Sequence, residues 1–249
     1  MVQDFFEYEK KLGTDCLIPF LQKQKVDLKN KSVLDLGCGY GGLLVALEEK
    51  YQLGQGTGID LDSEMIAAGQ KNSSPILILK NQDFFQIEKE TFDFILMRDV
   101  LEHIVLVEQA LKKAAELLNN GGMVYVSFAP FFSPFGGHQH NGSGFFSNLP
   151  WLQFLPEKHF RKLLNLKGNS YKTLRGLEAD MDTVLKTRLT ISRFIKILPK
   201  VGLKVHFHAR YLVRPDYKIK FGLPPIAFPT IPILDDFLCT GYEALLVKV

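Results

Sequence analysis

The sequence has few cysteines and only a small excess of positive charge. Its three cysteines, Cys16, Cys38 and Cys239, lie far apart and form no Cys-x-x-Cys pair, so neither a disulfide framework nor a zinc ribbon is indicated. Lys and Arg outnumber Asp and Glu by only 30 to 27, and the basic residues form no dense cluster. We therefore expect no nucleic-acid partner.

Long apolar runs are missing as well. No stretch approaches the roughly 20 residues that cross a bilayer. The first seven residues have neither a basic start nor an apolar core, which distinguishes them from a secretory signal. We expect a cytoplasmic protein without stable membrane insertion, acting as a monomer or a homodimer.

What the sequence does have is a regular alternation of short apolar runs and helical patterns. From residue 31 to 129 this alternation predicts a parallel sheet with crossover helices. The expected strands are 32–36, 56–60, 75–79, 92–97 and 123–128, and the expected helices are 42–50, 63–70 and 105–118. A helix at 191–201 and strands at 204–213 and 243–249 would complete the sheet with an antiparallel edge. The fold class is α/β: a Rossmann-like, doubly wound, mostly parallel seven-stranded sheet with an antiparallel C-terminal edge strand.

The chain is interpreted as a single domain, 1–249, in four parts. Residues 1–30 form an N-terminal helical cap with a helix near 4–21, and residues 31–129 form the ligand-binding core. Residues 130–189 are rich in Phe, Gly and Pro and have no sustained period. Because a flexible linker would not carry so many aromatic residues, we predict a lid or acceptor-binding insertion after the fifth strand. Residues 190–249 complete the sheet.

A glycine-rich loop follows the first expected strand. Gly37, Gly39 and Gly42 satisfy G-x-G-x-x-G between a strand and a helix, which by itself indicates only nucleotide binding in general. Asp35, two positions before the first glycine, narrows the choice. A carboxylate there would repel a pyrophosphate but favours S-adenosylmethionine (SAM), which carries an ammonium and a sulfonium and no phosphate. Asp60, at the end of the second strand, lies where an acid accepts both hydroxyls of a ribose.

Residues 33–42, Val-Leu-Asp-Leu-Gly-Cys-Gly-Tyr-Gly-Gly, resemble the first SAM-binding motif of class I methyltransferases. Further matches follow in the expected order: Gly-Ile-Asp-Leu-Asp at 58–62, Asn-Gln-Asp-Phe at 81–84, Phe-Asp-Phe-Ile-Leu at 92–96, Val-Leu-Glu-His-Ile at 100–104 and Leu-Asn-Asn-Gly-Gly at 118–122. The resemblance covers roughly residues 30–130. It departs from the family at 118–122, where Lys-Pro-Gly-Gly is usual, and we expect a turn there in either case.

The resemblance implies a small-molecule, SAM-dependent methyltransferase that releases S-adenosylhomocysteine (SAH). It implies that Asp83 binds the adenine amino group, that the backbone amide of Phe84 lies near the ring, and that Arg98 and Asp99 lie beside the methionine part. Tyr8, on the N-terminal helix, is a further candidate, although packing is the commoner role of such an aromatic. The expected cofactor-binding residues are Tyr8, Asp35, Gly37, Cys38, Gly39, Asp60, Leu61, Asp83, Phe84, Arg98 and Asp99.

A hydroxyl acceptor has to lose a proton, so methyl transfer to it calls for a general base. The candidates are His138 and His140, among glycines and aromatics in the expected lid, and His103, since a neutral histidine suits proton abstraction near pH 7. The segment Asp99-x-x-Glu102-His103 also resembles the metal-binding element of quinone-type and small-RNA 2′-O-methyltransferases. There it would hold a divalent cation together with His138 or His140. Leu-Glu-His is also common in class I methyltransferases that use no metal, and we expect none here.

The aromatic residues of the expected lid predict a small-molecule acceptor that is apolar or planar, either aromatic or lipid-like. Two alternatives remain open: a SAM-binding protein without transferase activity, and an NAD-dependent oxidoreductase. Amino-group methylation of DNA is not indicated. The tetrapeptide Asn/Asp-Pro-Pro-Tyr/Phe is absent after the fourth strand, where the sequence reads Arg98-Asp99-Val100-Leu101.

Overall fold

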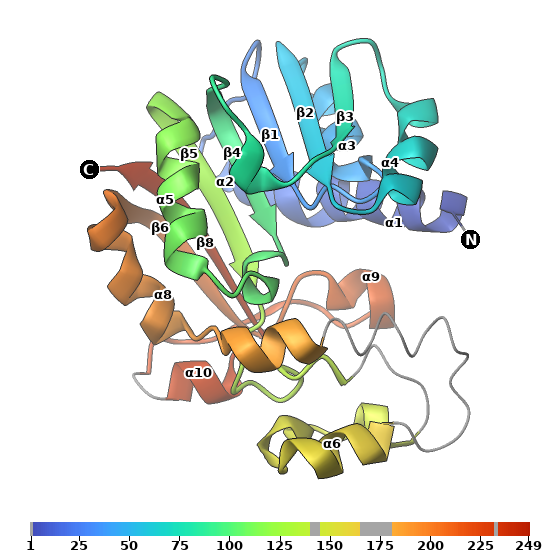
Figure 1. Ribbon diagram of the computed structural model, residues 1–249, viewed down its shortest axis with the longest axis vertical. Helices are drawn as coiled ribbons and strands as arrows, with labels where there is room; N and C mark the ends of the chain where they lie inside the picture. The colour runs from blue at the N-terminus through green and yellow to red at the C-terminus, as the bar shows by residue number, and fades with distance from the viewer. Residues whose placement is uncertain (1, 140–144, 165–180, 232–233) are drawn as a thin grey trace.

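The computed structural model describes residues 2–139, 145–164, 181–231 and 234–249. Their centre is an eight-stranded sheet with the order β3-β2-β1-β4-β5-β8-β6-β7 (Figure 1). The strands are β1 (Ser32–Leu36), β2 (Gln55–Asp60), β3 (Leu77–Asn81), β4 (Phe92–Arg98), β5 (Leu118–Phe128), β6 (Leu203–Val213), β7 (Ile226–Ala227) and β8 (Gly241–Lys248). The pairs among β1 to β5 are all parallel, so the predicted α/β class with a mostly parallel sheet is confirmed.

The last strand, β8, is not at the edge of the sheet. It runs antiparallel between β5 and β6 and pairs with both, and the two-residue β7 adds the eighth strand beside β6. The first six residues of β8 are all buried. A strand covered on both faces is expected to carry a nearly continuous apolar run, which explains the sequence Ala-Leu-Leu-Val within it.

Helices cover both faces of the sheet (Figure 1). One apolar core joins the sheet to α1 (Val2–Leu12), the π-helical turn Gly13–Leu17, α2 (Ile18–Lys23), α3 (Gly42–Tyr51) and α4 (Ser63–Gly69). The other core joins it to α5 (Val107–Leu117) and α8 (Ile191–Ile197). The single helix expected over 4–21 is thus divided by the π turn. There α1 and the π turn pack against α3 so closely that a Cβ at Gly13 would lie 2.6 Å from Cβ of Ala46.

Further helices lie beyond the carboxyl ends of the parallel strands (Figure 1). They are α6 (Glu157–Leu164), a helix at 181–187, α9 (Tyr217–Phe221) and α10 (Leu234–Leu238). The expected lid begins as a compact turn. The Gln153 side-chain amide donates to the carbonyls of Phe131 (3.0 Å) and Ser133 (2.7 Å), and that of Gln139 donates to those of Pro134 (2.9 Å) and Leu149 (3.1 Å).

His140 lies outside the described residues. Within the described ranges, none of the helices is both long and apolar enough to cross a membrane.

Candidate functional site

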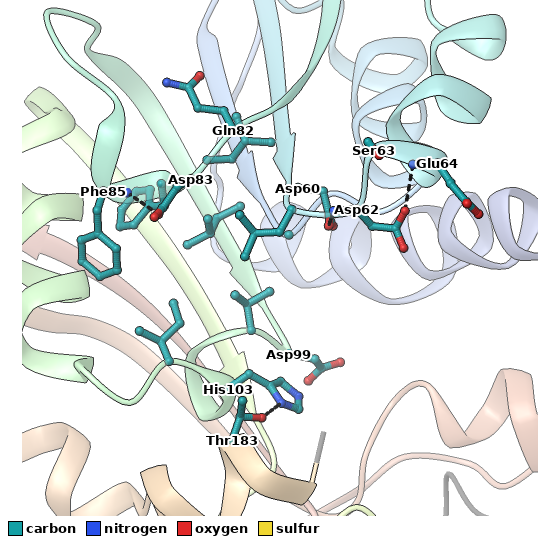
Figure 2. A pocket seen from close by; sticks show the side chains of 17 residues that line it. Asp60, Asp62, Ser63, Glu64, Gln82, Asp83, Phe85, Asp99, His103 and Thr183 are labelled. Atoms are coloured by element: carbon teal, nitrogen blue, oxygen red, sulfur yellow. Dashed lines mark hydrogen bonds between the residues drawn. The ribbon is translucent and has the colours of Figure 1, made fainter. Parts of the chain in front are cut away.

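A cavity of about 1050 Å³ opens at the carboxyl ends of β1, β2 and β4. The order of the strands reverses between β1 and β4, and ligands of open α/β sheets bind at such a switch point. Figure 2 shows Asp60 and Asp83 toward one end of the cavity and Asp99, His103 and Thr183 toward the other. Its volume is at the upper end of the roughly 300–1,000 Å³ of small-molecule sites. The acids on its wall, which suit a cationic ligand, are Asp60, Asp62, Glu64, Asp83 and Asp99.

The glycine-rich loop between β1 and α3 is hydrogen-bonded to the end of β2. The N–H groups of Gly37 and Cys38 both donate to the carbonyl of Ile59, at 2.8 and 3.0 Å. The N–H of Gly39 donates to Oδ2 of Asp60 at 2.9 Å. Gly37 and Gly39 have φ of 69° and 54°, a left-handed conformation that glycine adopts without strain.

The same loop is also hydrogen-bonded to α1, through the carboxylate of Glu9. The N–H of Tyr40 lies 3.1 Å from each carboxylate oxygen of Glu9, and the N–H of Gly42 lies 3.0 Å from Oε2. The remaining loop amide, at Gly41, donates to the carbonyl of Cys38 at 2.8 Å. Burial raises the pKa of Glu9 to about 7, although both amides lower it. Every backbone N–H from 37 to 42 therefore donates within the protein, which leaves carbonyl oxygens as the loop's hydrogen-bonding groups for a ligand.

Asp60 has the position expected of a ribose ligand, and the structure shows how that position is set. Its Oδ1 accepts the N–H of Asp62 at 2.9 Å, and its Oδ2 accepts that of Gly39. The neighbouring Leu61 also lines the cavity and is 77% exposed. The carboxylate is thus fixed at the cavity wall by backbone donors on both sides.

Asp83 and Phe84 line the cavity beyond β3. Asp83 caps the 3₁₀ turn Phe84–Gln86, with Oδ1 accepting the N–H of Phe85 at 3.0 Å. The side chain of Phe84 is buried in the core, while that of Phe85 is 39% exposed. A capped turn of this kind holds an acid and an aromatic backbone in fixed positions at the end expected for adenine.

Asp35 lies behind the cavity wall, in β1. It is 1% exposed, and neither carboxylate oxygen has a hydrogen-bond partner among the described residues. Burial, followed by the charges of Glu9 and Asp60, raises its pKa well above the ordinary value, and Arg98 opposes them. A buried carboxyl without a partner is costly unless a cation compensates it.

Four more of the expected cofactor residues are also absent from the cavity wall: Tyr8, Cys38, Gly39 and Arg98. The Arg98 side chain is buried, 3.5 Å from Oδ2 of Asp99. Burial raises the pKa of Tyr8 and of Cys16, and the charge of Arg98 opposes that rise. Of the pair expected beside methionine, Asp99 is the member that lines the cavity.

Asp99 follows β4 with φ of 51°, which is unusual for a residue other than glycine. Both its oxygens accept from Nη2 of Arg214, at 2.7 and 2.6 Å. Burial would raise the pKa of Asp99, but Arg214 and Arg98 hold it well below the ordinary value. Asp99 is therefore an anion that is already paired, and it joins the end of β4 to the segment after β6.

A second chamber of about 200 Å³ shares Asp99 and His103 with the large cavity. Its other lining residues come from the 3₁₀ turn Leu101–His103, the start of the expected lid, and the α9 region: Glu102, Ala129, Ser133, Phe135, His138, Arg214, Asp216, Tyr217, Lys220 and Thr240. Because His103 belongs to both walls, it lies where a molecule in one space would meet a molecule in the other.

Glu102, His103 and His138 form a compact group at this junction. Their ligand-type atoms all lie within 4.8 Å of one another, and the two imidazole rings are 4.8 Å apart at 71°. His103 Nδ1 lies 2.9 Å from Oγ1 of Thr183. Burial, followed by the charge of Asp99, raises the pKa of Glu102 to about 8. The group is compact enough to exchange a proton or to hold a divalent cation.

The comparison with protein families agrees with this geometry. Residues 9–168 match the family model described as "Methyltransferase domain". The chain belongs to this methyltransferase family. The ubiquinone biosynthesis O-methyltransferase of Coxiella burnetii is 30% identical over 110 residues, which are 42% of this chain and 46% of that protein. The methyltransferase described here thus spans about half the length of the curated relatives it matches.

Solved structures of methyltransferases share the fold. A putative SAM-dependent methyltransferase from Listeria monocytogenes superposes with a TM-score of 0.57 and 19% identity, covering 93% of this chain and 97% of that one. The O-methyltransferase NcsB1, solved with SAH and 1,4-dihydroxy-2-naphthoic acid, has a TM-score of 0.50 and 17% identity, covering 88% and 49%. The predicted methyltransferase family is confirmed by the family model, and the solved structures share the predicted fold.

Three residues of this methyltransferase site were missed in the sequence: Glu9, Thr183 and Arg214. Each acts through a partner that is distant in the chain, with separations of 31 and 33 residues for Glu9, 80 for Thr183 and 115 for Arg214. No local pattern marks them. The expected roles of the other site residues, including His103 and His138, remain predictions.

Proposed function

We propose that this methyltransferase transfers the methyl group of SAM to a hydroxyl of a small planar apolar molecule, an aromatic or lipid-like compound. The observation that carries the proposal is the junction of the two spaces. The large cavity has Asp60 and Asp83 on its wall, and it shares His103 with a chamber that is large enough for a hydroxyl-bearing ring. SAM in the first space would then direct its methyl group toward an acceptor in the second.

The names of similar proteins support a hydroxyl acceptor. The relative from Coxiella burnetii is named a ubiquinone biosynthesis O-methyltransferase, and NcsB1 is an O-methyltransferase solved with a dihydroxynaphthoic acid. The second chamber has Phe135 and Tyr217 on its wall beside polar groups. Such a wall suits a flat ring that carries hydroxyls.

In this proposal the cofactor lies along the acids in the order expected from the sequence. Asp83 and Phe84 bind adenine, Asp60 binds the ribose hydroxyls, and the loop carbonyls with Asp99 face the methionine part. The sulfonium would then lie nearest to His103. Alignment of acceptor and methyl group supplies most of the catalysis, roughly 7–11 kcal/mol in favourable cases.

His103 is our first choice for the general base. Its contact with Thr183 fixes the orientation of the ring and, when Nδ1 donates its proton to the threonine hydroxyl, leaves the lone pair on Nε2 for the acceptor proton. His138 lies edge-on beside it and would orient the acceptor hydroxyl or pass the proton on. A base of this kind contributes about 10²–10⁴-fold in rate.

The side chains of Glu102, His103 and His138 also fit a divalent cation. Their ligand-type atoms, one carboxylate oxygen and two imidazole nitrogens, lie within 4.8 Å of one another. Asp99 does not fit as a further ligand, since Arg214 takes both its oxygens. A bound cation would lower the pKa of an acceptor hydroxyl. EDTA tests this alternative. If EDTA abolishes the activity and Mg²⁺, Mn²⁺ or Zn²⁺ restores it, a bound cation and not a histidine base activates the acceptor hydroxyl.

The function is tested by incubating the protein with SAM and hydroxylated aromatic compounds, 1,4-dihydroxy-2-naphthoic acid among them, and measuring SAH release. We expect release with at least one hydroxyl-bearing ring. Calorimetry without acceptor gives the second readout. SAM binding without SAH release across the panel would favour a non-catalytic SAM-binding protein, and binding of NADH in place of SAM would favour the oxidoreductase.

Substitutions at the junction separate catalysis from cofactor binding. We expect His103→Ala and His138→Ala to lower turnover by about 10²-fold and to leave SAM affinity unchanged. His140→Ala tests the third candidate in the same assay. The matched control is His159→Ala, since His159 is exposed on α6. Unchanged turnover in all three candidate variants would exclude a histidine base.

A further inference from the structure

Glu9 reaches over the glycine-rich loop from outside the sheet and accepts two of its backbone N–H groups. It projects from α1, the helix that crosses the start of α3. A Cβ at Gly42 would lie 2.5 Å from the carbonyl of Phe6 and 2.6 Å from the amide of Lys10, so the two helices touch backbone to backbone. The carboxylate of Glu9 then lies against Gly39, where an added Cβ would collide with Oε1.

The loop amides of Tyr40 and Gly42 are the donors that such a loop normally offers to a phosphate. In nucleotide-binding α/β folds, the N–H groups at the start of the first helix point at the ligand, and the helix dipole favours a negative charge there. Here both amides donate to Glu9, at 3.0–3.1 Å. The other four amides of 37–42 donate to Ile59, Asp60 and Cys38.

We propose that Glu9 is a built-in anion that occupies the phosphate site of the loop and thereby determines specificity for a phosphate-free, cationic cofactor. A dinucleotide would have to displace the carboxylate and accept the repulsion of Asp60 beside it. SAM has no group that needs these donors, and its positive charge is favoured by both acids. The inference rests on SAM as the proposed cofactor.

The experiment compares wild type, Glu9→Ala and Glu9→Gln by calorimetry with SAM, SAH, NADH and inorganic phosphate, without an acceptor. Glu9→Ala frees two amides, and we expect it to bind NADH and phosphate at least tenfold more tightly than wild type. SAM affinity should fall about tenfold, and added acetate should restore it by refilling the site. Glu9→Gln keeps the shape and loses the charge, so it should lie between the two. Glu7→Ala, at an exposed position on the same helix, is the matched control and should behave as wild type.

The outcomes separate this inference from the proposed function. If wild type binds no SAM, the proposed function fails whatever the variants do. If wild type binds SAM, but Glu9→Ala and Glu9→Gln melt as wild type and gain no affinity for NADH or phosphate, the role of Glu9 is overturned and the proposed function stands.

Discussion

Two separate features of the structure exclude a side chain at Gly39. Its φ of 54° is left-handed, and an added Cβ would displace the carboxylate of Glu9. Any side chain at this position would therefore disturb the loop itself before it met a ligand. The glycine is therefore required by the protein's own packing, whatever ligand the loop binds.

The two constraints can be separated by comparing Gly39→Ala with Gly121→Ala. Gly121 also has a positive φ, 77°, but its added Cβ would have no atom within 4 Å. Left-handed strain alone costs about 1–2 kcal/mol, so urea unfolding should show this loss for both variants and a larger loss for Gly39→Ala. Calorimetry should show loss of SAM binding in Gly39→Ala only. If both variants lose the same free energy of unfolding, the contact between Gly39 and Glu9 does not contribute to stability.

The pKa of Glu9 predicts how cofactor binding depends on pH. Burial raises this pKa from 4.5 to about 7, so the folded protein takes up a proton that the unfolded chain has released. The stability of the cofactor-free protein should therefore fall as pH rises from 4.5 to 7. Above pH 7 the carboxylate is anionic and favours the sulfonium of SAM.

SAH is the matched ligand for this prediction because it has the same amino-acid part and lacks the sulfonium charge. We expect the ratio of SAM to SAH affinity, measured by calorimetry, to rise between pH 6 and pH 8 in wild type and to stay level in Glu9→Gln. A ratio that does not change with pH in wild type would refute the electrostatic role of Glu9.

The residues that could be predicted are those that follow a strand directly. Asp60 and Asp83 lie at the cavity because they come at or just after the ends of β2 and β3, whose carboxyl ends share one edge of the sheet. Glu9 and Arg214 could not be predicted in the same way. Their positions depend on how α1 crosses α3 and on where β6 ends, and both are set by packing between distant segments.

At the scale of elements, the buried strands were recognisable from their apolar runs, and their ends were less so. β1 has the expected bounds, 32–36. β3 was expected from 75 but begins at Leu77, in line with the missing N–H of Pro75, which cannot donate to a sheet. The turn expected at 119–122 is instead a bulge within β5: the register with β4 shifts between Phe92 and Phe94, and Gly121 is left-handed there.

Arg214 is the cation that joins the end of β4 to the segment after β6. Arg214 binds Asp99 with two hydrogen bonds and Asp216 with a third, at 2.5 Å. Its side chain is 13% exposed, as against 34% for Asp99 and 4% for Asp216. Removing Arg214 leaves the two acids with longer ion pairs only, Asp99 with Arg98 and Asp216 with Lys220, each at 3.5 Å.

We expect Arg214→Ala to lower the free energy of unfolding by about 3 kcal/mol, the lower end for breaking a buried pair. It should also reduce methyl transfer, because Asp99 lines the same two spaces as His103. The control is Arg161→Ala. Arg161 also binds two acids, Glu157 and Asp182, but near the surface, so its loss should cost at most about 1 kcal/mol. Chemical unfolding of both variants tests this, and similar losses would contradict the importance of the junction.

At the scale of the whole molecule, α1 and α9 meet beside the second chamber, whose wall includes Lys220. Tyr8 on α1 and Lys220 on α9 are in contact, with Nζ 5.7 Å from the ring centre, and Asp99 joins the central sheet to the same region through Arg214. The parallel core alone, 31–129, would lack both α1 and α9. We therefore expect a bound cofactor to stabilise contacts among the N-terminal helix, the core and the C-terminal segment together.

Cofactor binding should accordingly protect the fold as a unit. At 100 times its dissociation constant, SAM should stabilise the protein by about 2.7 kcal/mol, which for a chain of this size raises Tm by about 5–10 °C. Hydrogen exchange should slow in α1 and in α9 as well as in the loop at 37–42, because Glu9, Tyr8 and Lys220 connect them. Asp60→Ala provides the control: at the same SAM concentration its Tm should rise by less, since the ribose contacts are lost. Protection confined to 31–129 would show that the core binds the cofactor without the two ends of the chain.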